Sequence, residues 1–189
     1  MDSDSIVLDG GRVAVAASQV ILQNTSLANE VFTAAETSAN ATGAIAFSAT
    51  DMAITFGQMA DTNADGDATN DLAVVGAAEL AISVTNSLVV SGEGVLTTDG
   101  DLNIESAALV TALIETTGEE ADDLSTVTVA DAAFVAENGT ITTRFNGSTA
   151  ETGSGYGGAI TLQAASVNHG GRIISLGNDS SDVHRNGGG

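Results

Sequence analysis

The chain has 189 residues, a length typical of one domain. It carries 25 acidic residues against four arginines and no lysine, so its formal net charge is −21. A surface of this sign repels nucleic acid and anionic membranes, so we expect neither as a partner and no membrane insertion. Cysteine is absent, which excludes disulfides and thiolate sites. Aromatic residues make up only 3%, which indicates thin, regular apolar layers rather than a core with large anchors.

One short phrase recurs along the chain and predicts β-structure. Its clearest copy runs from Gly158 to Val167, where Ile160, Leu162 and Ala164 alternate with other residues. This period of two is typical of a strand with one buried face. A second apolar row follows seven residues after the first apolar residue in five copies and eight residues after it in one. The six copies begin their apolar rows at Val13, Ile45, Leu80, Leu102, Val127 and Ile160.

The spacers between the copies vary while the phrase stays constant, which indicates a repeat whose loops accept insertions at fixed points. Each repeat also contains a third apolar patch. These patches are Val31–Phe32, Leu72–Val75, Val95–Leu96, Leu113–Ile114, Ile141 and Ile173–Ile174. Three short strands per repeat predict an all-β fold, a parallel β-helix (β-solenoid) of about six coils with loop insertions. The six residues that begin the apolar rows are then expected to form one column.

The predicted domain organisation is a β-helix segment over residues 1–176 and a flexible tail over residues 177–189, rich in Gly, Ser and Asn. An antiparallel sandwich also has alternating strands, but it does not explain the recurring offset of seven residues. Residues 27–39 are open to two interpretations, a short helix or a side loop.

One acidic segment resembles a metal site. Its candidate ligands are Asp61, Asn63, Asp65, Asp67 and Asp71. Oxygen-bearing side chains at alternate positions, with Gly66 in sixth place, match the start of a calcium-binding loop. The twelfth position is Leu72 rather than the usual bidentate glutamate, and Asp71 is the candidate substitute. The segment predicts a Ca²⁺ site, with a plain solvated acidic loop as the alternative.

Catalytic chemistry has weaker support in the sequence. A glycosidase needs two carboxylates at a set separation. Glu105 and Asp131 hold comparable but not identical places in the fourth and fifth copies, which makes a carbohydrate-active β-helix enzyme an alternative. His169 and His184 lack the spacing of metal ligands, and the four arginines do not cluster. We therefore expect a non-catalytic protein and assign no catalytic or cofactor-binding residue.

Three segments resemble the filamentous haemagglutinin family, the large exoproteins of bacterial two-partner secretion. They are Gly10–Leu22, Asp99–Ala107 and Gly157–Ile173, which share a glycine-containing turn, an alternating strand and a small residue. The resemblance implies a right-handed β-helix in a secreted or surface protein, with a glycan of the host or surface as a further partner. It implies a structural shaft segment of an exported adhesin or filament, extracellular or on the bacterial cell surface. A calcium-dependent extracellular assembly module is another alternative.

The ends of the predicted stack are expected to be open. Residues 6–8 read as the last strand of an earlier coil, and Ile173–Ile174 completes the sixth. Unpaired strand edges template further pairing, so neighbouring copies of the same protein are expected to associate end to end.

Overall fold

The computed structural model describes residues 5–7, 11–23, 41–56, 72–112, 114–116, 126–128, 130–147, 158–171 and 173–174. Every regular element in these ranges is a β-strand and none is a helix, so the all-β prediction is confirmed for this part of the chain. The strands form a mostly parallel 12-stranded sheet and a separate two-stranded one, and the large sheet is not closed into a barrel.

The strand bounds follow the chain. They are β1 (Ser5–Val7), β2 (Arg12–Gln23), β3 (Gly43–Thr55), β4 (Leu72–Val75), β5 (Ala77–Val84), β6 (Leu88–Ser91), β7 (Glu93–Thr98), β8 (Asp101–Ser106), β9 (Leu109–Ala112), β10 (Ile114–Thr116), β11 (Thr126–Thr128), β12 (Asp131–Phe145), β13 (Ala159–Gly170) and β14 (Ile173–Ile174). β10 and β11 form the antiparallel two-stranded sheet, and every other pairing is parallel.

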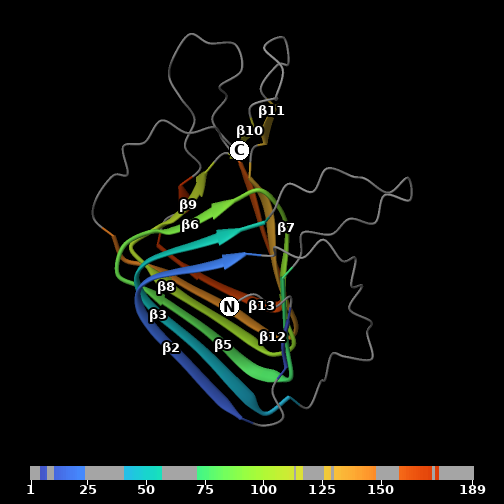
Figure 1. Cartoon of the computed structure of the whole chain (residues 1–189). Helices are drawn as coiled ribbons and strands as arrows, with labels where there is room; N and C mark the ends of the chain where they lie inside the picture. Colours follow the sequence, from blue (N-terminus) through green and yellow to red (C-terminus); the bar gives the residue numbers. More distant parts are fainter. Residues whose placement is uncertain are drawn as a thin grey trace.

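The large sheet consists of three rows of laterally paired strands. The first row runs β2, β3, β5, β8, β12 and β13, and Figure 1 shows these strands side by side from blue to red. The second row runs through the second halves of β2 and β3, then β6, β9 and β14. The third row runs β1, β4, β7, then the first halves of β12 and β13. The long strands β2, β3, β12 and β13 therefore each belong to two rows.

The register of the first row confirms four members of the expected apolar column. Val13 pairs with Ile45, Ile45 with Leu80 and Leu80 with Leu102. The column then continues through Ile141 and Val167. β1 pairs with β4, so residues 6 and 7 lie in a strand that precedes the first repeat, whereas Leu8 lies outside the described residues.

The predicted places of Val127 and Ile160 in that column are wrong. Val127 pairs antiparallel with Glu115 in the small sheet. Ile160 pairs with Ala132 in the third row. The alternating pattern and the offset of seven residues are compatible with any two consecutive rows of strands. They therefore do not show in which row a given copy of the phrase begins. The third patches shift for the same reason, since Ile141 lies in the first row and Ile173 in the second.

The apolar side chains of all three rows gather in one interior cluster. Along β3 and β5 buried residues alternate with more exposed ones, as expected for strands with one face turned inward. The largest fully buried side chains of the cluster are Ile45, Ile54, Phe56, Leu80, Ile82, Leu88, Leu96, Leu102, Ile104, Leu109, Phe134 and Ile141. Most of these side chains are branched aliphatic, but the two largest are Phe56 and Phe134, so the core has large anchors that the low aromatic content did not indicate.

Glycine makes the turns between rows possible at three places. Gly76, Gly92 and Gly171 have φ values of 77°, 82° and 101°, a region that side chains with a Cβ rarely adopt. Gly76 joins β4 to β5, Gly92 joins β6 to β7, and Gly171 lies between β13 and β14. Each one therefore turns the chain from one row into the next.

Candidate functional site

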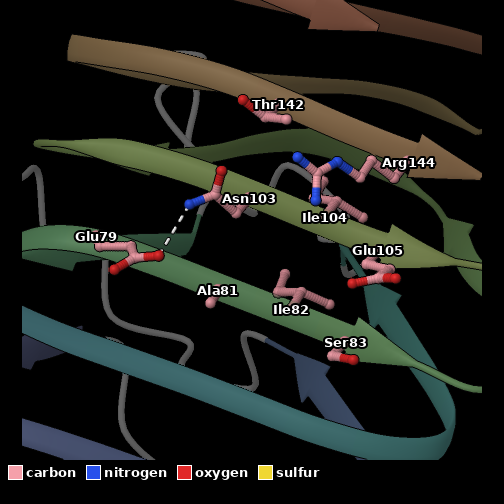
Figure 2. A pocket seen from close by; sticks show the side chains of 9 residues that line it. All are labelled: Glu79, Ala81, Ile82, Ser83, Asn103, Ile104, Glu105, Thr142 and Arg144. Atoms are coloured by element: carbon pink, nitrogen blue, oxygen red, sulfur yellow. Dashed lines mark hydrogen bonds between the residues drawn. The ribbon is translucent and has the colours of Figure 1, made fainter. Parts of the chain in front are cut away.

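A shallow depression lies on the outer side of the first row, over β5, β8 and β12 (Figure 2). Its volume is about 400 Å³, within the range of small-ligand sites. The polar side chains that line it are Glu79, Ser83, Asn103, Glu105, Thr142 and Arg144. Strand alternation explains their position, because these residues lie between inward-facing members of the apolar columns. Ala81 lies at the centre of the depression, and its short side chain leaves space there.

One end of the depression is organised by a hydrogen bond. The Asn103 side-chain nitrogen donates to Glu79 Oε1 over 2.9 Å, between neighbouring strands β8 and β5 (Figure 2). This bond orients the carboxamide and leaves the Asn103 carbonyl oxygen and the second Glu79 oxygen as acceptors for a ligand.

The other end carries the positive charge. Arg144 pairs in register with Glu105, so their side chains leave adjacent strands on the same side. In Figure 2 the Arg144 guanidinium extends over β8 toward Asn103, whereas the Glu105 carboxylate lies on the opposite side of Ile104. No ion pair joins Arg144 to any residue in the described part of the chain, so its guanidinium is available to a ligand.

Four planar polar groups therefore lie around Ala81. They are the carboxylates of Glu79 and Glu105, the carboxamide of Asn103 and the guanidinium of Arg144. Each presents two polar atoms in one plane, an arrangement that can grip two neighbouring hydroxyls of a ligand. The described residues of the lining include no aromatic ring, and the contacts that they offer a ligand are hydrogen bonds rather than stacking.

Asp99 is a second unusual acidic residue, and its role is structural. It is 1% exposed, and its Oδ2 accepts a hydrogen bond of 2.6 Å from the backbone nitrogen of Gly76. This bond satisfies an amide at the turn between β4 and β5. Asp99 Oδ1 and Thr98 Oγ1 have no partner among the residues that the structure describes.

The structure describes only one of the two candidate sites that the sequence suggested. The calcium segment, with Asp61, Asn63, Asp65, Asp67 and Asp71, lies outside the described residues, and within them no group of three His, Cys, Asp or Glu residues is placed to hold a metal. Glu105 and Asp131 are not brought together. Glu105 pairs with Arg144 in the first row and Asp131 with Glu93 in the third, because β12 enters the third row before the first.

Sequence reasoning missed the depression itself. The signal for part of it was present, because Glu79 precedes Leu80 and Asn103 follows Leu102 in the aligned copies. The position of Arg144 follows from the row in which Ile141 lies, and the local sequence pattern does not show which row that is.

The edge strands β2 and β13 form a second candidate surface. Val13 and Val15 on β2, and Ile160 and Leu162 on β13, belong to the interior face yet remain only partly buried. Val167 is 41% exposed although it ends the first apolar column. These residues mark an interior that is open at both ends of the described stack.

His169 lies next to Val167 on the open β13 edge. Its Nδ1 lies 2.6 Å from Thr143 Oγ1 in a hydrogen bond, and its ring centroid lies 5.6 Å from that of Phe145. The column that ends at His169 runs through Val15, Phe47, Ile82, Ile104 and Thr143. An imidazole thus occupies an interior position that has no further strand over it among the described residues.

No family model matches the chain, and no curated protein or solved structure is significantly similar to it. In the described part of the chain no helix has the length and apolarity needed to cross a membrane.

Proposed function

We propose that the chain is a segment of a right-handed parallel β-helix and serves as a structural, non-catalytic shaft of an exported bacterial adhesin or surface filament. The observation that supports this most is the continuous register of the three rows. One column passes through Val13, Ile45, Leu80 and Leu102 and on to two further strands without a change of side. The right-handed sense and the adhesin class rest on the resemblance to the filamentous haemagglutinin family.

This architecture suits a load-bearing rod. Parallel strands one above another place their hydrogen bonds along the stacking direction, and each strand adds about 4.8 Å of length. The six strands of the first row thus span roughly 24 Å from β2 to β13. Pulling on the rod would load many backbone hydrogen bonds at once, while the acidic surface keeps neighbouring rods apart in solution.

The shaft proposal has two tests. A crystal structure should show a right-handed stack with Leu102 inside it, and an antiparallel sandwich would refute the fold. Antibodies against this chain should label intact cells of the source organism, and proteinase K should remove the label. Labelling only after cell lysis would refute the proposed extracellular or cell-surface location.

A second candidate function is glycan binding at the outer depression. Its support is the set of planar groups at Glu79, Asn103, Glu105 and Arg144. Two carboxylates and one guanidinium give these groups a net charge of −1, and the whole chain is acidic, so a neutral glycan fits better than an anionic one.

The geometry favours binding over hydrolysis. Glu105 pairs with Ser83, which lies four residues beyond Glu79 on β5. The backbone positions of Glu79 and Glu105 are therefore about 13 Å apart along the strand direction. The carboxyl groups of glycosidase pairs lie about 5–9.5 Å apart. Asp101 pairs with Glu79 but does not line the depression, and its Oδ1 accepts from the Thr140 backbone nitrogen.

Nuclear magnetic resonance can test this second function. Titration of the labelled protein with cellohexaose or maltohexaose should shift the amide signals of Ala81, Asn103 and Arg144. The variant Arg144→Ala should lose these shifts, and Gln163→Ala, an exposed change on the third row, should keep them. No shift with either sugar, or shifts spread over other rows, would refute a glycan site at the depression.

A further inference from the structure

We infer that the β13 edge of one copy receives the β2 edge of a second copy in a head-to-tail contact that covers His169. This inference rests on the proposed shaft function and names its partner, a second copy of the same chain. The contact would extend the stack by the same parallel pairing that holds the chain together.

The two edges lie at opposite ends of the first row (Figure 1). Among the described residues β2 pairs only with β3, and β13 only with β12. The outward-facing N–H and C=O groups of both strands therefore lack strand partners there. Such groups template pairing with another strand, and no charged residue lies on the interior face of either strand to oppose it.

The residue columns show how a second copy would fit. Val13 and Val167 end one column, so the Val13 of an incoming copy would lie over Val167. The second row runs from Val20 through Met52, Leu88 and Leu109 to Ile173 and has five strands, one fewer than the first row. The first row therefore sets the fit, and there an apolar residue would meet an apolar residue without any shift of register.

The direction of the contact follows from the strands. Head-to-tail stacking keeps β2 parallel to β13, like every pairing in the large sheet. A two-fold pairing of β2 with another β2, or of β13 with another β13, would be antiparallel and would break the columns. After a head-to-tail contact forms, one copy still has a free β2 edge and the other a free β13 edge. Further copies can therefore add, and the product is an open filament rather than a closed dimer.

His169 lies within this contact. The incoming Val15 would cover the imidazole, because Val15 and His169 end the same column. On β12 the imidazole contacts Thr143 and Phe145. Arg144 follows Thr143 but lines the outer depression. A carboxylate in place of His169 would therefore be covered without a charged partner on these residues, which is unfavourable.

The first experiment tests the surfaces by mixing two variants. Val13→Glu should block the β2 edge and Val167→Glu the β13 edge, and each variant alone should be monomeric by sedimentation velocity. Their equimolar mixture should form dimers and nothing larger, because one intact edge of each kind remains. Dimers of either variant alone would indicate a two-fold contact, and monomers in the wild type at all concentrations would overturn the inference.

The second experiment tests whether His169 lies inside the contact. His169→Glu should weaken association, because the incoming Val15 would cover an unpaired carboxylate. Asn168→Glu, the matched control, adds the same charge to the outer side of β13, beside Thr142, and should associate like the wild type. Equal association of His169→Glu and the wild type would overturn the role of His169. Circular dichroism of each variant shows whether the β-fold remains, so loss of association is distinguished from failure of the shaft proposal.

Discussion

At the residue scale, Phe56 and Gly94 share one interior space. Phe56 is fully buried, and a Cβ on Gly94 would lie 2.7 Å from Phe56 Cδ1. Gly94 continues the column of Ile160 and Ala132 in the third row, so its missing side chain leaves room for a ring from elsewhere. A column position without an apolar side chain can therefore still belong to the core.

This pairing gives a prediction for Gly94→Ala. The added methyl group should destabilise the fold by about 1–3 kcal/mol, because Phe56 has no free space to enter. In the Phe56→Leu background the same change should cost less, with a coupling of about 0.5–3 kcal/mol. Urea denaturation of the two single variants and the double variant measures the cycle. Strictly additive effects would show that the two side chains do not compete.

A second residue-scale prediction concerns Leu102, which is 0% exposed in the middle of the first row. Leu102→Asp would place an unpaired charge in the core and should cost about 3–5 kcal/mol. The control Ala14→Asp adds the same charge to the exposed side of β2 and should change stability by no more than about 0.5 kcal/mol. Equal effects of the two substitutions would place Leu102 outside the core.

At the scale of the elements, the glycine turns decide how strands are joined. Gly76 has a positive φ, and its backbone nitrogen donates to the buried Asp99 carboxylate. A turn and a buried acidic group therefore stabilise each other where β4 gives way to β5. This contact joins residues 23 positions apart in the sequence, so it also ties two successive repeats together.

Replacement of Gly76 tests how much the glycine at this turn contributes to the free energy of unfolding. Gly76→Ala should destabilise the fold by about 1–3 kcal/mol because alanine is strained at positive φ. Gly11→Ala is the matched control, since nothing lies within 4 Å of an added Cβ there and its φ lies outside the left-handed region. The control should be neutral or stabilising by up to about 1 kcal/mol. Thermal unfolding of both variants, compared with the wild type, gives the result.

The acidic segment at Asp61, Asn63, Asp65, Asp67 and Asp71 still predicts calcium binding. If Ca²⁺ binds there, a concentration of ten times Kd should raise the free energy of unfolding by about 1.4 kcal/mol. Thermal unfolding in CaCl₂ and in EDTA measures this change, and MgCl₂ serves as the ionic control. Asp65→Asn should reduce the gain. Identical unfolding curves in all three solutions would contradict a structural Ca²⁺ site.

At the scale of the whole molecule, the fold has a well-covered middle and open edges. Leu80 and Leu102 are 0% exposed, whereas Val167 at the end of their column is 41% exposed. Strands in the middle have partners on both sides, and the described edges β2 and β13 have one each. Stability should therefore fall from the centre of the stack toward both edges.

Hydrogen exchange can measure this gradient. In dilute solution the amides of β5 and β8 should exchange most slowly, and those of β2 and β13 faster. At concentrations where copies associate, β2 and β13 should gain protection together, while the protection of β5 and β8 stays unchanged. Uniform exchange across the first row would contradict the gradient.

The sequence by itself determined the strand character of the repeats and four members of the main apolar column. Alternation and a fixed offset are local properties, and the pairing register follows them directly at Val13, Ile45, Leu80 and Leu102. Only the tertiary structure decided that β12 and β13 enter the third row before the first, because the same local pattern suits any turn between rows. That choice moved Ile160 out of the column, separated Glu105 from Asp131, and placed Arg144 opposite Glu105. It also put His169 on the open edge, since an edge is defined by missing partners, which no local pattern records.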